Sequence, residues 1–191
     1  MRPEKAEKLN KLAKDVLILS RNTLLVNLRF LDAALSQFDF FPIEESSLLT
    51  DGKHILYNPR HILENYRIAK EIPVRDYLHM VMHCVFRHMY MDPSLNRPYW
   101  DLACDIAVEN VITELGLKIT LASREGKQAR YIAAIKQELK YVTAEKIYAY
   151  LRLTATAEVD GTVLNLSTDA KIVVRAPQRC TELRPSKKTS H

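Results

Sequence analysis

Residues 77–84 constrain this chain most, because they place two histidines in a run that is otherwise apolar and typical of a buried helix. His79 and His83 are four residues apart, and four residues of an α-helix turn through about 400°. The two imidazoles are therefore expected on one face of the helix, where together they could hold a cation. The alternative is a pair of buried histidines that bond to carbonyl groups or neighbouring acids.

The next helical segment supplies carboxylates for the same region. Asp101, Asp105 and Glu109 recur every four residues, so they are expected to form one stripe along a helix. If this stripe is buried it needs a partner of opposite charge, and otherwise it is a solvated face. Asp105 is our first choice as a third ligand for a cation held by His79 and His83.

His88 is the competing third ligand. It follows His83 by five residues, which turns it away by roughly 140° on a continuous helix. His88 can therefore bind only if the helix ends or bends near Arg87. Otherwise we expect His88 to lie beside the ligands without binding the cation itself.

Composition predicts a globular protein with one main domain. The chain has 191 residues, 47% of them hydrophobic, and a formal net charge of +5. Its apolar runs fall well short of the ~20 residues of a membrane span, and the N-terminus lacks a signal-peptide pattern. We therefore expect a cytoplasmic protein without a membrane segment, and reduced thiols at the three unpaired cysteines, Cys84, Cys104 and Cys180.

The positive charge lies mainly near the two ends of the chain and is not interleaved with aromatic residues. Such a distribution is typical of solvated surfaces, so nucleic-acid binding is not expected.

The apolar spacing predicts a predominantly helical α+β fold. Helices are expected over residues 3–20, 22–38, 60–70, 73–90, 99–115, 126–139 and 143–153. Asp51-Gly52 between short apolar runs predicts a β-hairpin, and with it a small antiparallel sheet within residues 39–58. Residues 1–153 are expected to form one domain. Residues 154–191 are expected to form a poorly anchored extension, in which 163–164 and 172–174 could be short strands.

Residues 79–83 and 100–105 resemble two segments of a known family. The sequence HMVMH at residues 79–83 stands where the family has H-E-x-x-H, and WDLACD at 100–105 matches its W-[ND]-x-A-x-D segment. The chain resembles, over roughly residues 5–153, the putative metallopeptidase domain of bacterial proteins that also carry a von Willebrand A-like domain. The resemblance implies a zincin-like domain that binds Zn²⁺ through His79, His83 and Asp105.

The chain departs from the family pattern at two points. Met80 replaces the glutamate that takes a proton from the zinc-bound water, and a thioether cannot accept that proton. Asp101, Glu109 or His88 could substitute for it, provided that one of them lies within hydrogen-bond reach. No D-x-S-x-S motif of a von Willebrand A-like domain follows residue 153, so we interpret the chain as a fragment, a truncated product or a lone domain.

Two functions are compatible with these residues, and whether the chain is an enzyme stays open. The first is a zinc metallopeptidase-like domain that hydrolyses a peptide or protein substrate weakly or not at all. The second is a non-catalytic module that binds a protein partner and keeps a structural or vestigial metal site, which the methionine at position 80 favours. A nucleic-acid-binding domain is a distant third, because only the charge of +5 supports it.

Overall fold

The computed structural model describes residues 3–44, 48–90, 92–121 and 125–159. In chain order these residues form α1 (Pro3–Asn27), the short 3₁₀ helix η1 (Arg29–Leu31), α2 (Asp32–Ser36), β1 (Asp39–Pro42), β2 (Leu48–Thr50), β3 (His54–Tyr57), α3 (Pro59–Ile68), α4 (Glu71–Val85), α5 (Arg97–Leu115), the 3₁₀ helix η2 (Lys118–Thr120), α6 (Glu125–Glu138) and α7 (Ala144–Val159). The predicted fold class, α+β and predominantly helical, is confirmed. The strands expected at 163–164 and 172–174 lie outside the described residues.

The N-terminal helix is longer than expected. One helix, α1, spans both the predicted helix 3–20 and the start of the predicted helix 22–38. The side chains of Ser20, Thr23 and Asn27 each donate to the carbonyl four residues earlier, so these polar residues lie within one continuous helix. The break comes instead at Leu28, which leaves the helical region with φ −128° and ψ 56°.

The predicted hairpin is present as β2 and β3. Gly52 takes a φ of 89° in the turn, and the Asp51 carboxylate accepts hydrogen bonds from the amides of Lys53 and His54. The sheet as a whole is mixed rather than antiparallel, because β1 adds to the free edge of β3 in parallel orientation, giving the order β1-β3-β2.

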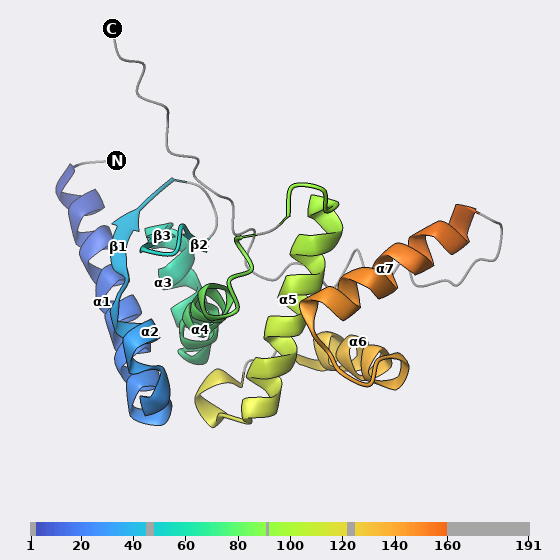
Figure 1. The fold of residues 1–191 in the computed structure, drawn as a ribbon. Coiled ribbons are helices and arrows are strands. Elements are labelled where there is room, and N and C mark those ends of the chain that lie inside the picture. Colours follow the sequence, from blue (N-terminus) through green and yellow to red (C-terminus); the bar gives the residue numbers. More distant parts are fainter. Residues whose placement is uncertain (1–2, 45–47, 91, 122–124, 160–191) are drawn as a thin grey trace, which may run out of the picture.

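Two helices, α4 and α5, lie at the centre of the fold. α4 lies between α1 on one side and α5 on the other (Figure 1). Asn96 caps the start of α5 by accepting from the amide of Tyr99, and Gly116 ends it with a φ of 60°, as the sequence predicted. α4 ends at Val85 rather than near Tyr90, because Arg87 takes a left-handed φ of 58°.

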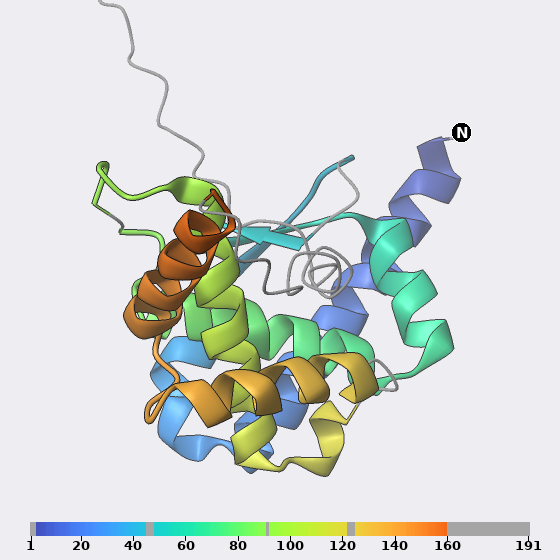
Figure 2. The same ribbon diagram turned by 90° about the vertical axis from the view of Figure 1, so that its right-hand side faces the viewer.

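The hydrophobic side chains form two clusters that share α5. The larger cluster joins α1, α2, the sheet, α3 and α4 to one face of α5, which contributes Val108 and Ile112. The smaller cluster joins the other face of α5, with Ala103 and Ile106, to α6 and α7. Figures 1 and 2 show α7 beside α5, on the side away from α4. Among the described helices, none combines the length and hydropathy that a bilayer span requires.

Candidate metal centre

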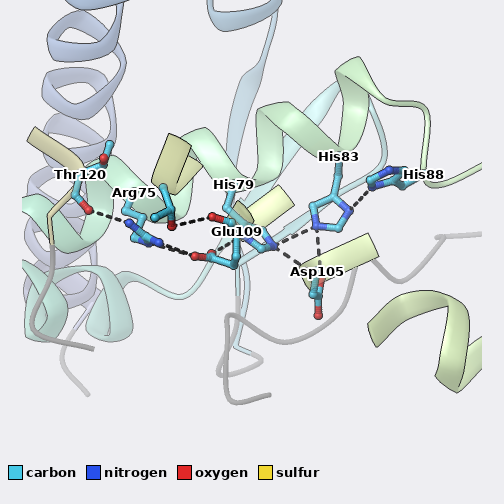
Figure 3. Close-up of polar contacts among 8 residues, drawn as sticks. Arg75, His79, His83, His88, Asp105, Glu109 and Thr120 are labelled. Carbon is cyan, nitrogen blue, oxygen red and sulfur yellow. Dashed lines mark hydrogen bonds and ion pairs between the residues drawn. The ribbon is translucent and has the colours of Figure 1, made fainter. Parts of the chain in front are cut away.

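Polar side chains from α4 and α5 face each other across the interface of these two helices. Arg75, His79 and His83 follow one another at four-residue spacing on α4, so they lie on one face. Asp105 and Glu109 lie opposite them on α5 (Figure 3). The contacts join Arg75 to Glu109 and His83 to Asp105, while His79 contacts both acids.

Three of these side chains converge on one point. His79 Nε2 lies 2.9 Å from His83 Nε2, and Asp105 Oδ1 lies 3.5 Å and 3.2 Å from these two atoms. Bonds of about 2.0–2.1 Å at tetrahedral angles place two zinc ligands roughly 3.3 Å apart. The separations in the structure bracket that value, so His79, His83 and Asp105 could together hold a single metal ion.

The cluster is buried but reaches the surface on one side. The side chains of His79 and His83 are 1% and 4% exposed, whereas that of Asp105 is 21% exposed. The cluster is therefore partly exposed to solvent at Asp105. A buried position also strengthens charge interactions at the cluster, because little water is present to screen them.

The Nδ1 atom of His79 is hydrogen-bonded to a carboxylate. This atom lies 2.7 Å from Oε1 of Glu109, and Nδ1–H must donate because a carboxylate can only accept. The Nε2 atom of His79 is thereby directed toward His83 and Asp105. Metal-binding histidines characteristically bond to a carboxylate in this way, which fixes the ring and its tautomer.

Glu109 is in turn held by Arg75. Oε2 of Glu109 accepts from Nε of Arg75 at 3.2 Å, and another guanidinium nitrogen of Arg75 donates to the carbonyl of Thr120 at 2.9 Å. Both oxygens of Glu109 are therefore bonded, one to His79 and one to Arg75. The sequence did not predict this role of Arg75, although Arg75 lies four residues before His79 on the same face of the helix.

The charges of the cluster support one another. Burial opposes a charge on His79, but hydrogen bonds to Asp105 and Glu109 outweigh it and raise the pKa of His79 to about 10. Burial also opposes ionisation of Asp105, yet hydrogen bonds from His79 and His83 lower its pKa to about 2. Burial lowers the pKa of His83 as well, so His83 is neutral at pH 7. A proton on His79 thus interacts favourably with the negative charges of Asp105 and Glu109.

The structure brings Asp105, rather than His88, to the Nε2 atoms of the histidine pair. Nδ1 of His88 lies 3.3 Å from Nδ1 of His83, on the opposite edge of that ring. Burial and the neighbouring His83 lower the pKa of His88 to about 4, so it is neutral at pH 7. His88 therefore contacts a histidine of the cluster without sharing its point of convergence.

The other proposed substitutes for a catalytic glutamate are engaged elsewhere. The side chain of Asp101 is 37% exposed and pairs with Arg97 at 3.3 Å, one turn before Asp105 on α5. Glu109 uses both of its oxygens, as described above. Met80 itself is 1% exposed and lies in the larger hydrophobic cluster.

Neither described cysteine has the environment of a nucleophile. Cys104 is buried in the smaller hydrophobic cluster, as expected for a core residue. Burial raises the pKa of the Cys84 thiol to about 11, so it stays protonated at neutral pH.

Comparison with protein families gives a match over nearly the whole chain. A family model described as a putative metallopeptidase domain matches residues 11–190. The match continues past residue 153, where the resemblance in the sequence was expected to end. Neither a search of curated proteins nor one of solved structures found a match.

Proposed function

Because the chain belongs to the putative metallopeptidase domain family, we propose that it binds one Zn²⁺ ion through His79, His83 and Asp105. The observation that carries this proposal is the convergence of two imidazole nitrogens and one carboxylate oxygen within 2.9–3.5 Å of one another. Two nitrogen ligands favour zinc over calcium or magnesium, which take oxygen ligands.

The residues of the site have separate tasks in this proposal. Glu109 keeps the proton of His79 on Nδ1, so that Nε2 offers its lone pair to the metal. Asp105 supplies a negative charge, and its exposed side is where a peptide or protein substrate would approach. A bound zinc ion would polarise a scissile carbonyl and lower the pKa of water.

The second candidate is a non-catalytic module that binds a protein partner. In this module the same metal site would serve to join α4 to α5. The position of Met80 favours this function, because a buried thioether replaces the family's glutamate. The engagement of Asp101 with Arg97 and of Glu109 with Arg75 favours it further.

Membership of the subgroup that also carries a von Willebrand A-like domain is part of the same proposal. It is supported by the segments HMVMH and WDLACD, which resemble that subgroup.

A peptidase assay on zinc-loaded protein separates the two candidates. Casein and mixed fluorogenic peptides would be incubated with the wild type, with Asp105→Asn, and with Asp32→Asn as a control at an exposed aspartate. Cleavage by the wild type and the control that is lost in Asp105→Asn would establish hydrolysis at this site. Zinc binding without cleavage would favour the interaction module, and failure to bind zinc would contradict the metallopeptidase-like candidate.

A further inference from the structure

We propose that His88 is a positioning residue of the metal site, which orients His83 by accepting a hydrogen bond from its Nδ1–H. This inference rests on the proposed zinc site, because it concerns how one of the ligands is held. It makes specific the expectation that His88 lies beside the ligands, and it differs from the two other sequence-based roles, a third ligand and a catalytic base.

The end of α4 is built to bring these two residues together. The amide of His88 donates to the carbonyl of His83 at 3.0 Å, and the amide of Arg87 donates to the carbonyl of Cys84 at 3.1 Å. This pair of bonds is the Schellman motif, with Arg87 in the left-handed conformation at φ 58°. The motif folds the residue after Arg87 back onto the last turn of the helix. His88 therefore contacts His83, although on a continuous helix the five-residue separation would turn it away from His83.

His88 is also fixed on its far side. The indole Nε1–H of Trp100 donates to the carbonyl of His88 at 3.2 Å, and the two rings meet edge to face with centroids 6.2 Å apart. The ring of Phe86 also contacts the ring of His88, with their centroids 5.5 Å apart. Trp100 belongs to α5, the same helix that carries Asp105, so one helix positions both the acid ligand and the residue that orients His83.

The chemistry of imidazole determines which ring donates. A hydrogen bond between two Nδ1 atoms forms only when one of them carries the proton. If His83 offers the lone pair of Nε2 to a metal, its proton must be on Nδ1, and His88 must accept it. His83 then has a hydrogen-bond partner at Nδ1, as His79 has Glu109.

Substitutions at His88 test this role, with zinc affinity rather than hydrolysis as the readout. In His88→Phe the ring contacts with Trp100 and Phe86 are kept, but the acceptor is lost. In His88→Asn the side-chain oxygen takes the place of Nδ1 as acceptor. His54→Phe is the control, because His54 pairs with Asp51 away from the site. Zinc affinity would be measured by competition with a chromogenic chelator, and the Co²⁺ absorption spectrum would report on ligand geometry.

We expect His88→Phe to bind one zinc with about 10–100-fold lower affinity and an altered Co²⁺ spectrum, as is usual when the partner of a ligand is removed. His88→Asn should recover most of the affinity, and His54→Phe should match the wild type. Wild-type affinity in His88→Phe would overturn the inference. Complete loss of zinc in both His88 variants would also overturn it, because His88 would then be a ligand.

A measurement on the unaltered protein keeps the inference testable if His88→Phe fails to fold. Nitrogen-15 spectra of the zinc-loaded wild type should show a proton on Nδ1 of His83 and none on Nδ1 of His88. The reverse assignment would overturn the inference while leaving the zinc site intact. A wild type that binds no zinc would instead contradict the proposed function itself.

Discussion

Nδ1 of His79 lies 2.7 Å from Oε1 of Glu109, a residue of the neighbouring helix and 30 positions further along the chain. This contact makes Glu109 a partner of a candidate ligand, although the sequence had suggested it as a substitute catalytic base. Because Arg75 bonds the other oxygen of Glu109, the carboxylate is fixed with its charge directed at His79.

Glu109→Gln should therefore weaken zinc binding about 10–100-fold without changing the number of zinc ions bound. The substitution removes the negative charge behind His79 and leaves Arg75 without its anionic partner. Chelator competition would measure the affinity. Glu114→Gln is the control, since Glu114 is an exposed acid of α5 that pairs with Lys136. Equal affinities in the two variants would contradict this role of Glu109.

Zinc binding at pH 7 should release about one proton. In the metal-free protein the hydrogen bonds to Asp105 and Glu109 raise the pKa of His79 to about 10, so its Nε2 is protonated at pH 7. A metal competes with that proton, and zinc affinity should therefore rise about tenfold per pH unit up to that pKa. His83 is neutral and Asp105 is ionised at this pH, so neither releases a proton.

Titration calorimetry in buffers of different ionisation enthalpy would count the released protons. Binding enthalpies that do not depend on the buffer would show that His79 is already neutral, contrary to this account.

Met80→Glu should destabilise the protein rather than restore a catalytic base. Met80 is buried among apolar side chains, and a carboxyl group there loses its hydration without a hydrogen-bonding partner. We expect a loss of roughly 3 kcal/mol or more in the free energy of unfolding, against less than about 1.5 kcal/mol for the control Met80→Leu. Urea unfolding would measure both variants. A stable Met80→Glu protein with new peptidase activity would mark this chain as an enzyme that has lost its glutamate.

Arg87→Gly should give a more stable protein than Arg87→Ala, by about 1 kcal/mol, because residue 87 has a left-handed φ. The opposite order is expected at Lys11, an exposed position within α1, where glycine costs about 1 kcal/mol relative to alanine. Thermal unfolding of these four variants would compare the two positions. If alanine is the more stable residue at both of them, α4 does not end as described.

The sequence predicted most of what depends on short, regular spacing. Four-residue steps predicted His79 and His83 on one helix face and Asp105 in an acidic stripe of the next helix, and the structure brings their ligand atoms together. The predicted end of the 99–115 helix and the Asp51-Gly52 hairpin are likewise present, with Gly116 and Gly52 at positive φ, which glycine tolerates.

The features that escaped prediction depend on contacts between distant residues or on an unusual backbone conformation. The end of α4 has no glycine that would mark it in the sequence, and Arg87 takes the left-handed conformation there. The parallel pairing of β1 with β3 and the bond from Arg75 to the Thr120 carbonyl join segments whose proximity no local pattern reveals. Position 80 could be read as a missing glutamate, but only its burial shows that the residue belongs to the hydrophobic core.

The most direct test of the account is the metal content of the purified protein, measured by elemental mass spectrometry. We predict about one zinc per chain in the wild type and in the control His54→Ala, and none in His83→Ala or Asp105→Ala. Absence of zinc from the wild type after zinc is supplied would contradict the account, as would full retention of zinc by His83→Ala.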